Sequence, residues 1–214
     1  MPEYDCIIPW SGGVESTAVV NWALKNKKTP LVIHNKLNAA EWESVQTMSN
    51  IFNIKVFKIE ETFDLTPDPL NREFYSKKFN YNSKWSPVIH RWAYWTAISN
   101  LLYPTIKHLY FGACYAGAVK YGDGLGDKMP DISIFQSFEN YLYVYGVESK
   151  FISPLDHMTK REQWLSLPEE IKCEIFTCQK EHAILHKKNC KSYECNKCHE
   201  LMRAVPNTEL HLIK

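Results

Sequence analysis

Residues 5–17 read Asp5-Cys6-Ile7-Ile8-Pro9-Trp10-Ser11-Gly12-Gly13-Val14-Glu15-Ser16-Thr17. The first half is a short apolar run that stops at a glycine pair, as a buried strand does at its end. Apolar residues with helical spacing follow over residues 16–27. The segment therefore predicts a buried strand, a tight glycine turn and a helix, which together form the first repeating unit of a parallel sheet.

The same alternation of strands and helices continues along the chain. Further strands are expected at residues 31–33, 55–59, 108–112 and 151–155, and further helices at 41–52, 88–103, 132–145 and 159–168. Residues 60–87 are polar and aromatic, and we interpret them as a long excursion that could cover an active site. The pattern predicts an α/β fold, with a parallel five-stranded sheet, helices on both faces and right-handed crossovers.

The turn over residues 11–16 has the composition of a phosphate-binding loop. Its glycines let the backbone approach phosphates closely, and the helix that follows contributes its positive N-terminal end. Ser11, Ser16 and Thr17 add hydroxyl donors. The sequence contains neither the Gly-Lys-Ser/Thr of Walker loops nor the Gly-x-Gly-x-x-Gly of dinucleotide-binding folds. We therefore predict a phosphate loop of another kind, with a plain tight turn before a capped helix as the alternative.

Four of the seven cysteines crowd into the last 40 residues of the chain. The final pair has Cys-x-x-Cys spacing, which lets two thiolates reach one ion. We predict a closed, structural zinc site that holds down the tail, with the ligands Cys178, Cys190, Cys195 and Cys198. Substitute ligands are Cys173, His182, His186 and His199. Reduced cysteines without a metal, and after that a redox pair, are the alternatives.

Composition and charge narrow the class of partner. The formal net charge is +1, and no basic region precedes a long apolar stretch at the N-terminus. Such a charge provides no general attraction to nucleic acid or to an anionic membrane, so we expect neither as a partner. We also expect no signal peptide and no membrane span, and the clustered cysteines favour a metal over disulfides. The expected compartment is the cytoplasm.

At residues 11–16 the sequence resembles the signature Ser-Gly-Gly-x-Asp-Ser/Thr of the PP-loop ATP pyrophosphatases, which adenylate a substrate and release pyrophosphate. Glu15 stands where that family usually has aspartate. The retained carboxylate implies a role with magnesium. The resemblance implies that ATP is bound by Ser11, Gly12, Gly13, Val14, Glu15, Ser16 and Thr17, with the backbone near His34 and Asn35 meeting adenine.

Within that family the whole chain resembles the 7-cyano-7-deazaguanine synthases, which combine such a loop with a C-terminal four-cysteine zinc site. Residues 154–162 match their Pro-Leu-x-x-x-Thr-Lys-x-Glu segment well, whereas residues 87–91 and 129–131 match other family segments only in part. The cysteine spacing departs from the usual Cys-x-x-Cys-x-x-Cys, which an extra loop between Cys190 and Cys195 would explain. The resemblance implies a nucleotide-binding and substrate domain over residues 1–170 and a zinc-binding tail over 171–214.

The resemblance also implies a reaction. The carboxylate of a 7-deazaguanine attacks the α-phosphate of ATP, ammonia displaces AMP to form an amide, and a second adenylation leads to a nitrile. The cofactors implied are ATP, magnesium and zinc, the partners are the small-molecule substrate and ammonia, and a homodimer is allowed. The residues implied are Lys160, Glu15 and Ser16 for catalysis, and Arg91, Tyr115 and Asp131 for the substrate.

Three other interpretations stay open. The first is a related ligase that stops at the amide or uses another nucleophile, as tRNA-thiolating enzymes do. The second is a degenerate module that binds nucleotide without catalysis, for which Glu15 is the best support. The third is a zinc-ribbon adaptor for nucleic acid, which the near-neutral charge makes the weakest. Lys160 also has a plain alternative as a solvated residue at a helix start, and Asp131 as an N-cap.

Overall fold

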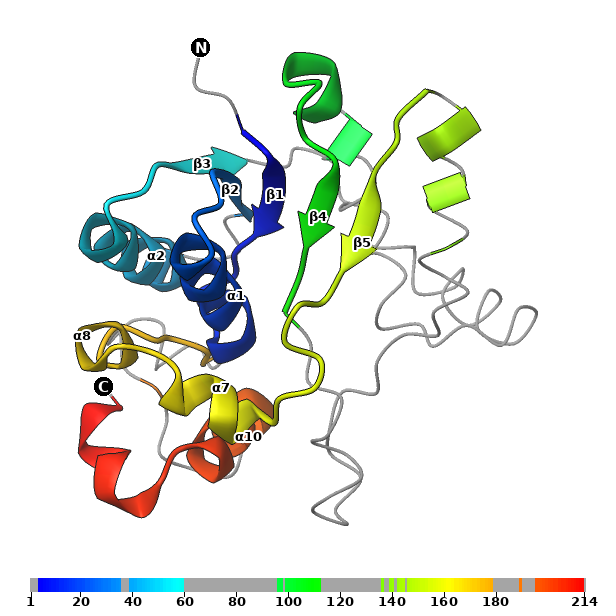
Figure 1. The fold of residues 1–214 in the computed structure, drawn as a ribbon. Coiled ribbons are helices and arrows are strands. Elements are labelled where there is room, and N and C mark those ends of the chain that lie inside the picture. Colours follow the sequence, from blue (N-terminus) through cyan, green and yellow to red (C-terminus); the bar gives the residue numbers. More distant parts are fainter. Residues whose placement is uncertain are drawn as a thin grey trace, which may run out of the picture.

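The fold is described from a computed structural model, which covers residues 4–35, 39–59, 96–112 without 98, 136, 139–140, 142–144, 146–178, 189 and 195–213. Five strands in these ranges form one sheet in the order β3-β2-β1-β4-β5, and every neighbouring pair is parallel. The strands are β1 (Cys6–Pro9), β2 (Pro30–Asn35), β3 (Val56–Ile59), β4 (His108–Tyr110) and β5 (Lys150–Ile152). The predicted parallel five-stranded sheet is confirmed (Figure 1).

The strand order places a ligand crevice at a definite point of the sheet. The chain runs outward from β1 to β2 and β3, and then returns to add β4 and β5 on the other side of β1. In open parallel sheets, ligands bind beyond the carboxyl ends of the strands where this order reverses. That point lies between β1 and β4, so the glycine turn after β1 and the residues after β4 border the crevice.

The sheet is buried on both faces, as predicted. On one face, Ile8 and Trp10 of the β1 region pack with the helices α1 (Val14–Lys25) and α2 (Ala39–Phe52). On the other face, Ile7 packs with Leu142 and Tyr103, which belong to or adjoin helical segments near residues 96–102 and 142–144. Alternate residues of one strand thus enter two different cores, as a strand between two helical layers requires. Among the helices of the described ranges, none is long and apolar enough to cross a membrane.

Several boundaries differ from the sequence prediction, among them the start of α1 and the end of β5. Helix α1 begins at Val14 instead of at residue 16, because Gly12 makes the turn by itself with φ +83° and Gly13 already acts as the N-cap. The amide of Thr17 donates to the Gly13 carbonyl at 3.0 Å, which closes the first helical turn. Strand β5 ends at Ile152 instead of at residue 155, because Pro154 has no N–H with which to continue the ladder. Because α1 already begins at Val14, Glu15 and Ser16 lie in its first helical turn.

The C-terminal segment packs beyond the carboxyl ends of the strands. Its helices are α7 (Lys160–Leu165), α8 (Glu169–Lys172), α10 (Asn196–Ala204) and a 3₁₀ helix (Asn207–Leu212). Figure 1 shows α7 and α10 past the arrowheads of β1 and β4, and α7 contacts both α1 and α10. Leu201, Val205 and Ile213 are buried in the same core as α1. The described part of the tail thus shares a core with the sheet, and a boundary at residue 170 stays a prediction.

Candidate active site and metal centre

The glycine turn after β1 is held closed by serine hydroxyls. The Ser11 and Ser16 Oγ atoms lie 3.0 Å apart, and the Ser11 amide donates to the Ser16 Oγ at 3.2 Å. The Ser16 hydroxyl donates in turn to the Gly13 carbonyl at 3.3 Å. Ser11 is exposed. These bonds gather two hydroxyls and the N–H groups of a helix start at the crevice, which is an arrangement suited to an anion such as a phosphate.

Not every residue of the predicted loop turns its side chain to the crevice. The Thr17 hydroxyl accepts a hydrogen bond of 2.9 Å from the Trp10 indole, and its residue is fully buried. The Val14 side chain is also buried, in the core beneath α1. Both side chains therefore hold the loop on the sheet, and only the backbone of these two residues is placed to meet a ligand.

Gly112, which follows β4, is a residue of the site that was not among the predicted site residues. A Cβ built on it would lie 2.5 Å from the backbone carbon of Glu15 and 2.6 Å from the amide nitrogen of Ser16. The chain after β4 thus touches the backbone of the first turn of α1, which only glycine permits. The spacing of residues in the sequence does not predict this contact, because Gly112 lies far along the chain from Glu15 and Ser16.

Replacing Gly112 by alanine is expected to lower the free energy of unfolding by about 1–3 kcal/mol, the usual result of overpacking a tight site. The atoms in the way belong to backbone and cannot swing aside as a flexible side chain would. Urea denaturation measures the change. Gly13→Ala is the matched control: its Cβ would meet nothing closer than 3.6 Å, so a loss below about 1 kcal/mol is expected. Equal losses in the two variants would contradict the proposed clash.

The start of α7 places Lys160 against the phosphate loop. Thr159 is the N-cap in a capping box: its hydroxyl accepts from the Glu162 amide, and its own amide donates to the Glu162 carboxylate at 2.7 Å. Lys160 is therefore the first helical residue, and its Nζ lies 2.7 Å from Glu15 Oε1 and 3.0 Å from Glu200 Oε2. We call Glu15, Lys160 and Glu200 the carboxylate–lysine triad. It joins the loop to the C-terminal helix α10.

The charge state of the triad follows from its surroundings. Burial opposes the ammonium form of Lys160, whose side chain is only 17% exposed. Attraction and hydrogen bonding to Glu15 and Glu200 outweigh that effect, so the pKa of Lys160 is raised above its usual value. The ammonium is thus retained at neutral pH. The triad itself holds two carboxylates and one ammonium, so a further cation there would favour the binding of a polyphosphate.

His34 lies near the end of β2 with its ring buried. Its Nδ1 is 2.7 Å from the Trp10 carbonyl, so Nδ1 carries the proton, and the ring stacks on Trp42 with centroids 5.4 Å apart. Burial lowers the pKa of His34 and Lys58 acts in the same direction, whereas the Trp10 hydrogen bond opposes them. The imidazole is therefore held neutral. Asn35 is the last residue of β2, so the backbone of both residues borders the carboxyl edge of the sheet.

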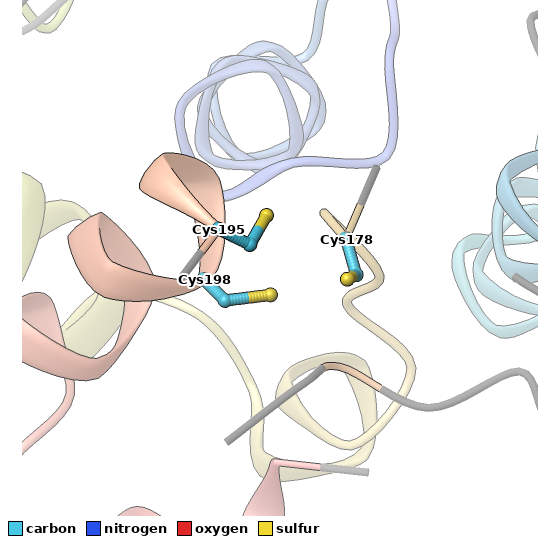
Figure 2. A group of neighbouring side chains, drawn as sticks. All are labelled: Cys178, Cys195 and Cys198. Carbon is cyan, nitrogen blue, oxygen red and sulfur yellow. The ribbon is translucent and has the colours of Figure 1, made fainter. Parts of the chain in front are cut away.

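Three of the four predicted metal ligands come together. The Sγ atoms of Cys178, Cys195 and Cys198 all lie within 4.8 Å of one another, and the three residues are buried. Cys195 is the N-cap of α10 and Cys198 lies in its first turn, and Figure 2 shows both side chains pointing towards Cys178. Buried, converging thiols fit a soft ion in tetrahedral geometry, for which zinc is the usual choice. The fourth predicted ligand, Cys190, lies outside the described residues.

Asn189, which precedes Cys190 in sequence, was not singled out from the sequence. Its side-chain oxygen accepts from the Thr177 amide at 2.9 Å, and its side-chain nitrogen donates to the Ile175 carbonyl at 2.8 Å. The residue is buried. Asn189 is thus tied to the segment that carries Cys178. Its oxygen also accepts from the Thr177 hydroxyl at 3.4 Å. The sequence contains no sign of this clamp, because hydrogen bonds to backbone groups leave no pattern of residue types.

Other predicted residues are placed apart or not described. Cys173, a substitute ligand, packs against the main core and is not part of the sulfur group. Arg91, Tyr115 and Asp131 lie outside the described residues, so their predicted contact with the substrate stays a prediction. The substitute ligands His182 and His186 lie there as well.

Comparison with known proteins adds a distant likeness. No family model matches the sequence, and no curated protein matches it. A solved structure described as a 4-thiouridine synthetase–RNA complex with bound ATP matches with 15% identity and a TM-score of 0.43. The match covers 75% of this chain and 39% of that chain, so this chain spans about two fifths of its length.

Proposed function

We propose that this protein is an ATP-dependent adenylating enzyme of the PP-loop type. The observation that carries the proposal is the 2.7 Å contact between Lys160 and Glu15. These residues belong to two motif-like segments far apart in sequence, Ser-Gly-Gly-x-Glu-Ser and Thr-Lys-x-Glu. A tight turn without function gives no reason for a lysine of the second segment to lie at the first. Their meeting at the crevice between β1 and β4 supports one shared phosphate site.

In this proposal the protein acts mainly by positioning and by neutralising charge. A carboxylate oxygen of the substrate forms a bond to the α-phosphorus of ATP, and the bond from that phosphorus to the bridging oxygen breaks, releasing pyrophosphate. The loop N–H groups, the hydroxyls of Ser11 and Ser16 and the ammonium of Lys160 bind the leaving pyrophosphate. Preorganised donors aimed at developing charge are a main source of rate enhancement in such reactions. No acid–base residue is needed for this step.

Magnesium and zinc have separate places in the proposal. Glu15 is 27% exposed at the crevice and offers a carboxylate, the ligand type that magnesium prefers, so Glu15 would hold the ion directly or through water. When bound, the ion supplies the positive charge that the triad lacks. Cys178, Cys195 and Cys198, with Cys190 as fourth ligand, would hold a structural zinc. The attachment of Asn189 beside the Cys178 segment supports the choice of Cys190.

The finer proposal concerns the substrate. We infer that it is a 7-deazaguanine carboxylate, converted with ammonia to the amide and then to the nitrile. The support is the match of residues 154–162 to the 7-cyano-7-deazaguanine synthases, together with a cysteine tail that follows the sheet domain. Arg91, Tyr115 and Asp131 are the residues proposed to contact the deazapurine.

Incubation with MgATP, ammonium and 7-carboxy-7-deazaguanine, followed by mass spectrometry and assays of AMP and pyrophosphate, tests the proposal. A nitrile with two AMP per product supports it fully. An amide with one AMP selects the related ligase, and AMP release only with another nucleophile changes the substrate class. Nucleotide binding without AMP release selects a degenerate module. A protein that binds no ATP at all refutes the proposal, including its phosphate loop.

A further inference from the structure

Helix α10 carries residues of two sites. Cys195 is its N-cap and Cys198 lies in its first turn, whereas Glu200, one residue into the next turn, contacts Lys160 Nζ at 3.0 Å. The Glu200 side chain is 21% exposed, so solvent screens this contact only in part. The metal centre and the phosphate loop are thus connected by one short helix and one lysine side chain.

A second contact fixes α10 against α7. The Arg161 guanidinium donates to the Ala204 and Arg203 carbonyls, at 3.3 Å each. These carbonyls end α10, where a cation also interacts favourably with the helix dipole. Leu201 packs beneath, in the main core. Consecutive residues of α7, Lys160 and Arg161, therefore hold two successive parts of α10 in register.

The helix depends on these attachments. It has nine residues, and isolated helices of that length are marginal in water. Arg161 holds its C-terminal end, and the main core holds its middle. Its N-terminal turn packs through Cys195 and Cys198 in a separate buried cluster with Ala40, Phe176 and Cys178. A metal on Cys195 and Cys198 would hold this turn, and with it the backbone that aims Glu200.

We propose that Glu200 is a positioning residue that couples the cysteine metal site to nucleotide binding, an inference that rests on the proposed function. A bound metal fixes the start of α10, and α10 in turn fixes the position of Glu200. Glu200 then keeps the Lys160 ammonium beside the loop when the Glu15 carboxylate binds magnesium instead of Lys160. Because coupling between two binding sites is reciprocal, nucleotide binding strengthens metal binding by the same factor. Coupling factors of about 5–150-fold are typical of such linkage.

A competing route runs through the Cys178 segment. A methyl carbon of Thr177 lies 3.7 Å from the place that a Cβ on Gly13 would take, and Thr177 precedes Cys178. The Thr177 methyl group is apolar, and this route would act on the loop at Gly13 and not through Lys160. The two routes are separable, since a change at Glu200 leaves Thr177 untouched.

The test compares wild type, Glu200→Gln and Glu170→Gln, the last being the same change at an exposed position of α8. Calorimetry gives the affinity of each zinc-loaded protein for a non-hydrolysable MgATP analogue. Competition with a chelator of known affinity gives zinc affinity with and without the analogue. We expect Glu200→Gln to bind the analogue about tenfold more weakly and to lose the effect of the analogue on zinc affinity, while Glu170→Gln matches wild type.

The direction of the change separates positioning from simple charge. Removing a carboxylate beside a polyphosphate should strengthen binding if Glu200 acts only through its charge. Weaker binding therefore supports a positioning role, and equal or tighter binding overturns it. Coupling that persists in Glu200→Gln also overturns it, in favour of the Thr177 route. A wild type that binds no nucleotide instead refutes the proposed function, and the inference with it.

Discussion

Replacing Lys160 by methionine is expected to lower the rate of pyrophosphate release by about 10²–10³-fold, the usual cost of removing one charge-stabilising group from a transition state. Methionine keeps an unbranched apolar chain but removes the ammonium that lies 2.7 Å from Glu15. In the proposed reaction, the charge that develops on the leaving pyrophosphate then loses a fixed cation beside the loop. Release of AMP and pyrophosphate at saturating MgATP measures the effect.

The same substitution leaves two carboxylates facing each other, so stability has to be measured separately. Removing one partner of a fully buried pair costs about 3–5 kcal/mol, and less is expected here because all three side chains are partly exposed. The double variant Lys160→Met/Glu200→Gln removes one of the two carboxylate charges and should recover stability without recovering turnover. A single variant that turns over at the wild-type rate would show that Lys160 is only a structural residue.

Replacing Cys195 by serine is expected to abolish stoichiometric metal binding and to lower the melting temperature by about 10 °C or more. Structural zinc sites contribute folding free energy directly, and loss of several kcal/mol shifts a chain of this size by about 2–4 °C per kcal/mol. The loss spreads beyond the tail, because Leu201 and Val205 belong to the main core. Metal analysis by mass spectrometry and a thermal melt with and without a chelator measure both effects.

Cys173→Ser is the matched control for that experiment. Cys173 is a partly buried cysteine near the same part of the chain, but it packs on the main core outside the sulfur group. Metal content should therefore stay at the wild-type level in this variant. Loss of metal in Cys173→Ser but not in Cys195→Ser would show that the metal is bound by the substitute ligands.

The sequence was sufficient where the deciding signal is local. Apolar runs, helical spacing and the glycine pair at Gly12 and Gly13 predicted the strands, the two helices after them and the turn between β1 and α1. Their order then predicted a parallel sheet, because a helix between two strands returns the chain to the same edge of the sheet before the next strand begins. The crowding of cysteines near the C-terminus likewise predicted that Cys178, Cys195 and Cys198 share a site, and the structure brings these three together.

Only the tertiary structure decided which residues meet across the chain. Gly112 must be glycine because it touches the backbone of α1, Asn189 is buried because it satisfies two backbone groups, and Glu200 matters because α10 lies beside Lys160. No residue spacing or local composition in the sequence predicts these contacts, since each depends on packing between elements that are distant along the chain. The loop at residues 11–16, including Glu15, is visible in the sequence, whereas Lys160 and Glu200 are brought to it by the fold.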